Sequence, residues 1–213
     1  MLNNVKFTYW FLALSYLLTL SISPHQYGFI QKALPIMILL LVAMKNLSGQ
    51  DRIFIASALF LSAMGDVLLA LSLKQSFIYG LAAFAAAHMC YTACFYRWRA
   101  WQKRHLIGLT ILGLYVLFML LLLLPATGKL QIPVLIYLII ISAMVYSAIG
   151  AKMPDYSILL GATLFVLSDS LLATHKFLFP LPYVSILVMS TYYSAQYFLL
   201  EGCIKKQGSN ALT

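Results

Sequence analysis

Long apolar runs separated by short polar gaps follow one another along almost the whole chain. Each run approaches the length of roughly 20 residues that an α-helix needs to cross the hydrocarbon core of a bilayer. The pattern therefore predicts an all-α, multi-pass membrane protein. The eight predicted transmembrane helices cover residues 7–23, 27–44, 53–73, 77–96, 106–125, 132–150, 156–174 and 181–203.

The composition supports a membrane protein and excludes most soluble classes. Hydrophobic residues make up 63% of the chain and charged residues only 9%, whereas a soluble domain has about 25% charged residues. The formal net charge is +9, and in a soluble protein such an excess would suggest nucleic-acid binding. Here the basic residues fall in the gaps between apolar runs, so membrane topology explains them and we expect no nucleic-acid partner.

The first apolar run is interpreted as a retained helix. Lys6 precedes it, as in a signal peptide, but cleavage after Ser23 would place Pro24 at the new N-terminus, which is unfavourable. The connections are short and no low-complexity linker interrupts the chain. We therefore expect one transmembrane domain over residues 1–213.

The positions of Lys and Arg predict the orientation. With the N-terminus inside, ten of the 14 basic residues lie on the inner side, most of the bias coming from residues 97–104. The outer side then holds the four lysines Lys32, Lys74, Lys129 and Lys176. By the positive-inside rule both termini are predicted to be cytoplasmic, and we expect the cytoplasmic membrane of a bacterium.

A weak internal repeat relates the two halves of the chain. Residues 61–70 (LSAMGDVLLA) resemble residues 164–173 (LFVLSDSLLA), since each has a small residue, Asp, any residue and Leu-Leu-Ala. The two segments belong to the third and seventh predicted helices. We expect parallel four-helix halves, 1–104 and 105–213, with chance similarity between apolar segments as the alternative.

Two acids lie inside predicted helices. Asp66 and Asp169 occupy matching places in the repeat, in the outer half of their helices. A carboxylate near a helix centre costs about 2.5–3.5 kcal/mol on insertion scales, so such acids usually face a cavity or a partner. We interpret the pair as functional. The alternative is that each Asp simply bonds a hydroxyl group or a lysine of a neighbouring helix.

Other polar side chains lie on the helices that follow the two acids. His88 and Tyr91 are spaced i, i+3 on one predicted helix, and Tyr193 and Gln196 repeat this spacing on the last helix, so each pair shares a face. We expect all four to orient the acids or a water molecule, with ordinary packing as the alternative. Lys32, near the outer end of the second helix, is either a snorkelling interfacial lysine or the partner of a phosphate or a carboxylate.

Common catalytic motifs are missing from the sequence. It has no Gly-x-Ser-x-Gly, His-Glu-x-x-His, phosphate-binding loop or Gly-x-Gly-x-x-Gly. His88 is the one histidine at depth, so a three-histidine zinc site is not supported, while a mixed Asp/His metal site stays open. We predict no metal and no cofactor.

The chain resembles one known family, the YhhN-like lysoplasmalogenases, in the order and spacing of five short motifs. These are Lys32-Ala33-Leu34-Pro35, Gly65-Asp66, Ala87-His88-x-x-Tyr91, Ser168-Asp169 and Tyr192-Tyr193-Ser194-Ala195-Gln196. The resemblance covers most of the chain. It implies an eight-helix membrane enzyme that hydrolyses the vinyl ether bond of a lysoplasmalogen to a fatty aldehyde and glycerophosphoethanolamine or glycerophosphocholine.

The predicted acids suit that chemistry. Hydrolysis of a vinyl ether begins with proton transfer to carbon and passes through an oxocarbenium ion, so it needs an acid, a nearby negative charge and a base for water. Two carboxylates can supply all three, as they do for glycosides. On this resemblance Asp66 and Asp169 are the catalytic pair, on adjacent helices, and Lys32 holds the phosphate. Which acid carries the proton stays open.

Two other functions use the same features. A proton-coupled transporter would also have duplicated halves and paired intramembrane acids, although it favours acids near the midplane. A non-catalytic lipid-binding or assembly subunit would not need two carboxylates at matching depths. The sequence indicates a lysophospholipid and the bilayer as partners and identifies no protein partner.

Overall fold

The computed structural model describes residues 3–20, 28–71 and 74–210. Within these residues the chain forms eight α-helices and two short 3₁₀ helices. In chain order the elements are α1 (Asn3–Leu20), α2 (Gly28–Asn46), α3 (Gly49–Ala70), α4 (Ser76–Arg97), α5 (His105–Leu123), η1 (Leu124–Ala126), η2 (Gly128–Leu130), α6 (Gln131–Gly150), α7 (Ser157–Phe177) and α8 (Val184–Asn210).

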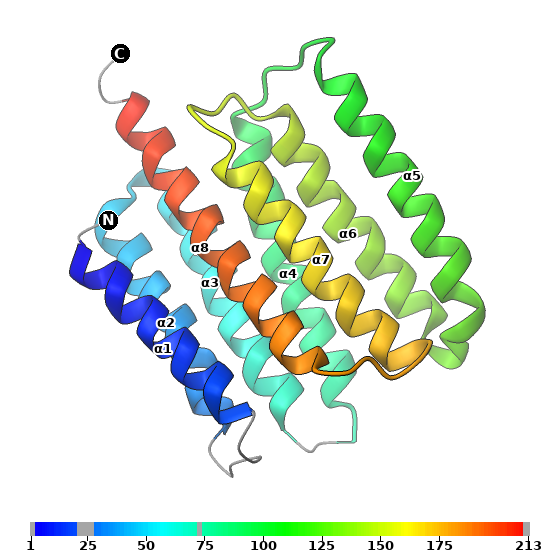
Figure 1. The fold of residues 1–213 in the computed structure, drawn as a ribbon. Coiled ribbons are helices and arrows are strands. Elements are labelled where there is room, and N and C mark those ends of the chain that lie inside the picture. Colours follow the sequence, from blue (N-terminus) through cyan, green and yellow to red (C-terminus); the bar gives the residue numbers. More distant parts are fainter. Residues whose placement is uncertain (1–2, 21–27, 72–73, 211–213) are drawn as a thin grey trace.

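The eight helices run up and down in one bundle (Figure 1). Each matches one predicted apolar run, so the all-α class is confirmed. Six of them, α2 to α7 with the adjoining 3₁₀ turns, are long and apolar enough to cross a membrane. The described parts of α1 and α8 are not in this set, so eight crossings stay a prediction.

Some helix ends differ from the sequence-based boundaries. α8 begins at Val184 rather than at 181, because a residue before proline disfavours the α conformation and Leu181 precedes Pro182. It then continues to Asn210, beyond the predicted end at 203, because its last turns pass from the apolar region into a polar segment that stays helical. The predicted ends and starts at 23, 27 and 73 lie outside the described residues.

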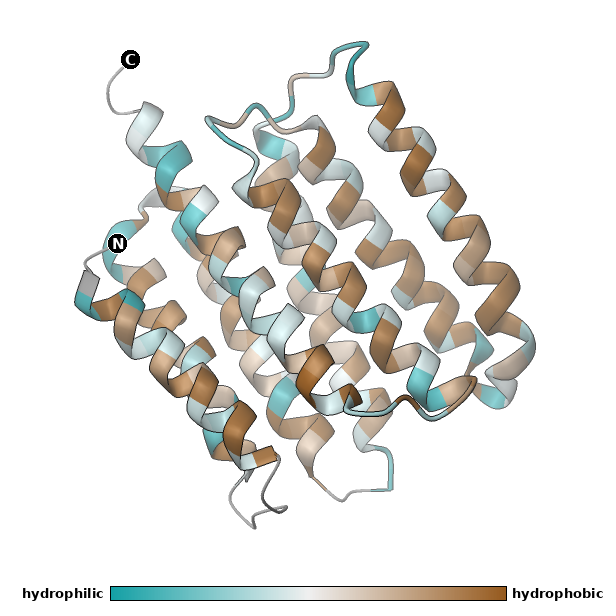
Figure 2. Cartoon of the chain, in the orientation of Figure 1, coloured by the Kyte–Doolittle hydropathy of each residue, from teal (hydrophilic) through white to brown (hydrophobic). Residues whose placement is uncertain are grey.

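The surface of α5 is the clearest sign of a lipid environment. α5 lies at one edge of the bundle, and Figure 2 shows it as almost uniformly hydrophobic. Its large side chains Ile107, Ile111, Leu114 and Leu121 are each more than 60% exposed. A soluble protein rarely exposes so large a contiguous apolar surface, whereas hydrocarbon chains would cover it.

Two helix pairs pack most closely, α3 with α4 and α7 with α8. Glycines permit the close approach. A Cβ on Gly65 would lie 2.7 Å from the ring of Phe84. A Cβ on Gly161 would lie 2.8 Å from the backbone nitrogen of Leu199. The close packing of α3 on α4 therefore explains the glycine of the Gly65-Asp66 motif.

Ion pairs collect at the end of the bundle where α1 begins and α8 ends. Lys6 pairs with Glu201 at 3.2 Å, and Lys205 pairs with Asp155 at 2.7 Å. Arg97 approaches Asp51 at 3.5 Å in the same region. α1 starts and α8 ends on the same side of the bundle (Figure 1), which agrees with the prediction that both termini share one compartment.

Replacing Gly161 with Ala is expected to destabilise the bundle. The new Cβ would meet the backbone of α8 at 2.8–2.9 Å, so the two helices must move apart, at a cost of about 1–3 kcal/mol. Thermal unfolding in detergent measures the change. Gly113→Ala is the matched control, because nothing lies within 4 Å of its added Cβ. Equal melting temperatures for both variants would contradict the packing described.

Thiol labelling of intact cells tests the orientation. Lys129 and Lys103 are both exposed and lie at opposite ends of the bundle. A membrane-impermeant reagent should label Lys129→Cys and spare Lys103→Cys, because the end with more basic residues stays inside. Permeabilised cells should show labelling of both variants. The reverse pattern in intact cells would invert the predicted topology.

Candidate active site

A cavity of about 780 Å³ opens between the helices and contains both intramembrane acids. Helices α2 to α8 all contribute to its lining. Asp66 comes from α3 and Asp169 from α7. Much of the rest of the wall is apolar, from side chains such as Phe84, Leu138 and Ile141. Both acids therefore line the same cavity.

The two acid-bearing helices do not pack side by side, which corrects the sequence-based expectation. α3 packs mainly on α2 and α4, and α7 packs mainly on α8 and α6. Close packing at glycines holds α3 against α4 and α7 against α8. This pairing leaves room between α3 and α7. The acids therefore line the cavity from two separate helices and do not lie at an interface between α3 and α7.

Asp66 is fully buried and both of its oxygens have partners. Its side chain is 2% exposed, and Oδ1 lies 3.1 Å from the Lys32 ammonium of α2. The Tyr192 hydroxyl of α8 donates to Oδ2 at 2.7 Å. An ammonium and a hydroxyl donor both favour the ionised carboxylate.

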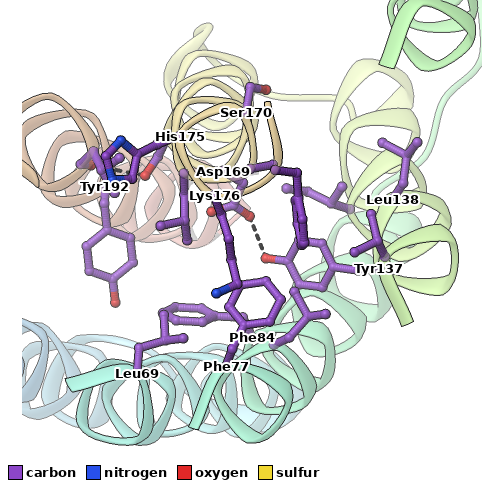
Figure 3. Close-up of a pocket in the computed structure, with 18 of the residues that line it drawn as sticks. Leu69, Phe77, Phe84, Tyr137, Leu138, Asp169, Ser170, His175, Lys176 and Tyr192 are labelled. Carbon is purple, nitrogen blue, oxygen red and sulfur yellow. Dashed lines mark hydrogen bonds between the residues drawn. The ribbon is translucent and has the colours of Figure 1, made fainter. Parts of the chain in front are cut away.

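Asp169 has a different environment. Its side chain is 20% exposed, and its Oδ2 has partners on two helices. The Tyr137 hydroxyl of α6 donates to Oδ2 (Figure 3), and His88 Nε2 of α4 lies 3.6 Å from the same oxygen. His88 Nε2 also lies 2.9 Å from the Tyr137 hydroxyl. In the described part of the chain Oδ1 has no hydrogen-bond or ion-pair partner, so it is left open to the cavity.

Asp66 and Asp169 each have one partner on the preceding helix and one on a more distant helix. Asp66 is contacted from the preceding helix, α2, and from α8; Asp169 is contacted from the preceding helix, α6, and from α4. In terms of the predicted halves, each acid thus has one partner from its own half and one from the other half.

Three of the predicted orienting residues have other contacts. Tyr91 donates to Gln196 Oε1 at 2.6 Å, a buried bond that ties α4 to α8, and neither residue lines the cavity. Tyr193 donates to the backbone carbonyl of Lys32 at 2.8 Å. Tyr91 and Gln196 therefore brace the bundle, while Tyr193 fixes the helix turn that carries Lys32. His88 alone of the four approaches an acid.

Lys32, for which the sequence indicated a phosphate or a carboxylate partner, contacts a carboxylate. Its side chain is 12% exposed and its ammonium faces Asp66. Lys32 therefore lines the cavity, but its ammonium pairs with the Asp66 carboxylate.

Tyr137 and Tyr192 were not predicted as site residues. Tyr137 lies in an apolar run without any marker of function. Tyr192 is part of the Tyr-Tyr pair, where spacing alone pointed to its neighbour Tyr193. The two tyrosines become recognisable once the acids are located, because each hydroxyl is the donor to one of them.

The described residues hold no group of three or more His, Cys, Asp or Glu side chains arranged to bind a metal ion. The aromatic rings of Phe165, Phe84 and Tyr192 pack edge to face. His88 packs on Phe165 with ring centroids 4.6 Å apart. Phe84 and Tyr192 of this aromatic cluster line the cavity.

Comparisons with known proteins agree with the motifs. The model of the YhhN family matches residues 27–203. A bovine protein (Bos taurus) named Lysoplasmalogenase TMEM86A is 32% identical over 88% of this chain and 82% of its own length. A Mycobacterium bovis protein named Lysoplasmalogenase is 30% identical over 80% of this chain and 68% of its own. A mouse protein (Mus musculus) named Lysoplasmalogenase TMEM86B is 33% identical over 75% of this chain and 67% of its own.

No solved structure gives a significant match to the chain. The family model covers most of the chain and includes both acids, their lysine and histidine contacts and both donor tyrosines. The chain therefore belongs to the YhhN family.

Proposed function

We propose that the protein is a lysoplasmalogenase that hydrolyses the vinyl ether bond of an alkenyl-glycerophospholipid with one chain. The observation that carries the proposal is the pair of intramembrane carboxylates facing one cavity, each with a distinct set of partners. The names of the relatives point to the same substrate. The enzyme class is that of an ether hydrolase, and the proposed reaction uses no cofactor.

The environments of the acids suggest their roles. We assign the negative, proton-accepting role to Asp66, because an ammonium and a hydroxyl hold its two oxygens. We assign the proton-donating role to Asp169, because it has no lysine or arginine partner among the described residues and its Oδ1 is open to the cavity. A pair of carboxyl groups, one protonated and one ionised, is a recurrent arrangement in acid–base catalysis. Because coupled acids titrate as a pair, the roles describe one protonation state of that pair.

The reaction then proceeds in balanced steps. Asp169 gives its proton to the carbon of the double bond remote from the ether oxygen, leaving an oxocarbenium ion that the negative Asp66 stabilises. Water adds to the carbon beside the oxygen and its proton passes to Asp66. The hemiacetal then breaks its bond to the glycerol oxygen, which takes the proton from Asp66. The hydroxyl proton of the hemiacetal returns to Asp169, and the aldehyde leaves.

His88 and Tyr137 are positioning residues in this scheme. The Tyr137 hydroxyl bonds Oδ2 of Asp169 and is itself in contact with His88, so the proton is kept on the opposite oxygen. Tyr193 has a similar role for Lys32, because it holds the carbonyl of that residue.

The setting of the enzyme follows from its surface. We propose eight membrane crossings, with α1 and α8 included because their polar side chains, such as Tyr9, Tyr192 and Gln196, are buried against other helices. Both termini are cytoplasmic and the membrane is the cytoplasmic membrane of a bacterium. The crossed contacts of the two acids support the half-repeats 1–104 and 105–213.

Removing either carboxyl group should abolish hydrolysis. Asp66→Asn and Asp169→Asn each remove a proton-transfer group, and such groups typically contribute about 10²–10⁴-fold to the rate. The measurement is aldehyde release from lysoplasmalogen by purified protein in detergent. Asp155→Asn is the control, because this carboxyl lies in an exposed ion pair outside the cavity lining, at the opposite end of the bundle from the cavity opening.

The controls separate loss of chemistry from loss of fold. Asp169→Asn should keep the thermal unfolding transition of the parent protein within a few degrees, whereas Asp66→Asn leaves the Lys32 ammonium unpaired and should lower the melting temperature. Full activity in both variants would rule out the acid-pair mechanism. Proton flux in liposomes without any aldehyde release from the parent protein would instead favour the transporter.

Lys32 should matter through its charge. Lys32→Met leaves a buried carboxylate without its counter-ion, which typically costs about 3–5 kcal/mol. We expect a lower melting temperature and a large loss of aldehyde release, with partial recovery of both in Lys32→Arg. The double variant Lys32→Met/Asp66→Asn removes both charges and should recover the melting temperature but no activity. A melting temperature for Lys32→Met equal to that of the parent protein would argue against the ion pair.

A further inference from the structure

Two lysines and a histidine stand at the opening of the cavity. Lys74 follows the end of α3, and His175 and Lys176 lie in the last turn of α7. All three line the cavity and all three are exposed. Figure 3 shows Lys176 extending from α7 toward Phe77, and its ammonium lies 4.3 Å from the centre of that ring.

No carboxylate in the described part of the chain pairs with Lys74 or Lys176. The sequence has only five acidic residues. Asp51, Asp155 and Glu201 pair with basic residues at the opposite end of the bundle, and the other two are the acids of the active site. The ion pairs of the described residues include neither Lys74 nor Lys176. The cavity opening therefore has excess positive charge.

His175 adds a directed donor. Its Nδ1 accepts a hydrogen bond from the backbone N–H of Leu181 at 3.0 Å. This bond places the proton of the neutral ring on Nε2. Nε2 has no partner among the described residues. Its N–H group is therefore available to donate a hydrogen bond at the cavity opening.

The spacing along α7 relates this charge to the acids. Lys176 follows Asp169 by seven residues, which is about two helical turns and about 10 Å along the axis. Residues so spaced lie on nearly the same face of a helix. In a lysoplasmalogen a glycerol unit separates the vinyl ether from the phosphate. A lipid with its vinyl ether at Asp169 therefore places its phosphate near Lys176.

We propose that Lys74, Lys176 and the Nε2–H of His175 form the binding site for the phosphate of a single-chain lipid. The proposal rests on the proposed function for its substrate and replaces Lys32, whose ammonium faces Asp66, as the phosphate ligand. Ammonium groups and an N–H donor suit the charge and acceptor oxygens of a phosphate. The apolar wall deeper in the cavity receives the hydrocarbon chain.

The test compares substrates with and without a phosphate. The variant Lys74→Gln/Lys176→Gln is assayed on alkenyl-glycerophosphoethanolamine and on alkenylglycerol. We expect KM for the phospholipid to rise roughly tenfold per lost cation, with kcat nearly unchanged, and KM for alkenylglycerol to stay constant. Lys129→Gln is the control, since this exposed lysine lies at the same end of the bundle outside the cavity lining.

Equal effects on the two substrates, or no effect on either, would overturn the phosphate site and assign the lysines to bulk lipid at the membrane surface. Inorganic phosphate at the same concentration should not compete with the lipid. Competition as strong as that of the phospholipid would mean a site for free anions instead of a headgroup.

Direct binding separates this proposal from the proposed function. Alkyl-glycerophosphoethanolamine has no vinyl double bond and cannot be cleaved, so its affinity is independent of any chemistry. The parent protein should bind it more tightly than alkylglycerol, and the double lysine variant should lose that preference. If the parent protein cleaves no vinyl ether but keeps the preference, the proposed function fails and the phosphate site stands. If it cleaves lysoplasmalogen without any preference for the phosphate, the site fails and the function stands.

Discussion

A carboxylate in the hydrocarbon region of a bilayer is stable only where another group compensates its charge, and the ion pair of Lys32 with Asp66 meets this requirement. The pair joins α2 to α3, and the Tyr192 hydroxyl extends it to α8. Tyr193 then binds the carbonyl of Lys32 itself. One buried charge thus accounts for the placement of polar groups on three helices.

The same requirement explains why the bundle is not packed uniformly. Glycines let α3 approach α4 and let α7 approach α8, and these tight pairs leave a space between them. Polar side chains point into this space because they cannot face lipid. The cavity is therefore a consequence of how the chain pairs its helices, and its chemistry comes from the few polar residues that the pairing encloses.

The sequence allowed the helices and the two acids to be predicted, because both produce strong signals. Twenty apolar residues specify a membrane helix, and an acid within such a run is rare enough to be noticed. The partners of the acids had no such signal. A tyrosine such as Tyr137 is compatible with packing, with the membrane interface and with a site alike, and only the packing of α6 on α7 distinguishes these uses.

Spacing along one helix was an incomplete guide for a related reason. Tyr193 and Gln196 were chosen as an i, i+3 pair, yet Tyr192 is the residue that meets Asp66. Neighbouring residues on a helix point about 100° apart, and the direction of the cavity depends on where the other seven helices lie. The direction of the cavity is thus set by tertiary structure and not by the spacing of residues along one helix. The sequence therefore predicted which helices form the site better than it predicted which of their side chains do so.

The crossed contacts have an evolutionary consequence. If the halves descend from one ancestral unit, two identical copies would have surrounded two equivalent acids, with no basis for one to give a proton and the other to accept it. A lysine on α2, where the corresponding helix α6 has Tyr137, removes this equivalence. Fusion into one chain would have allowed the two copies to diverge at that place, and so to turn a symmetric pair of acids into a directional one.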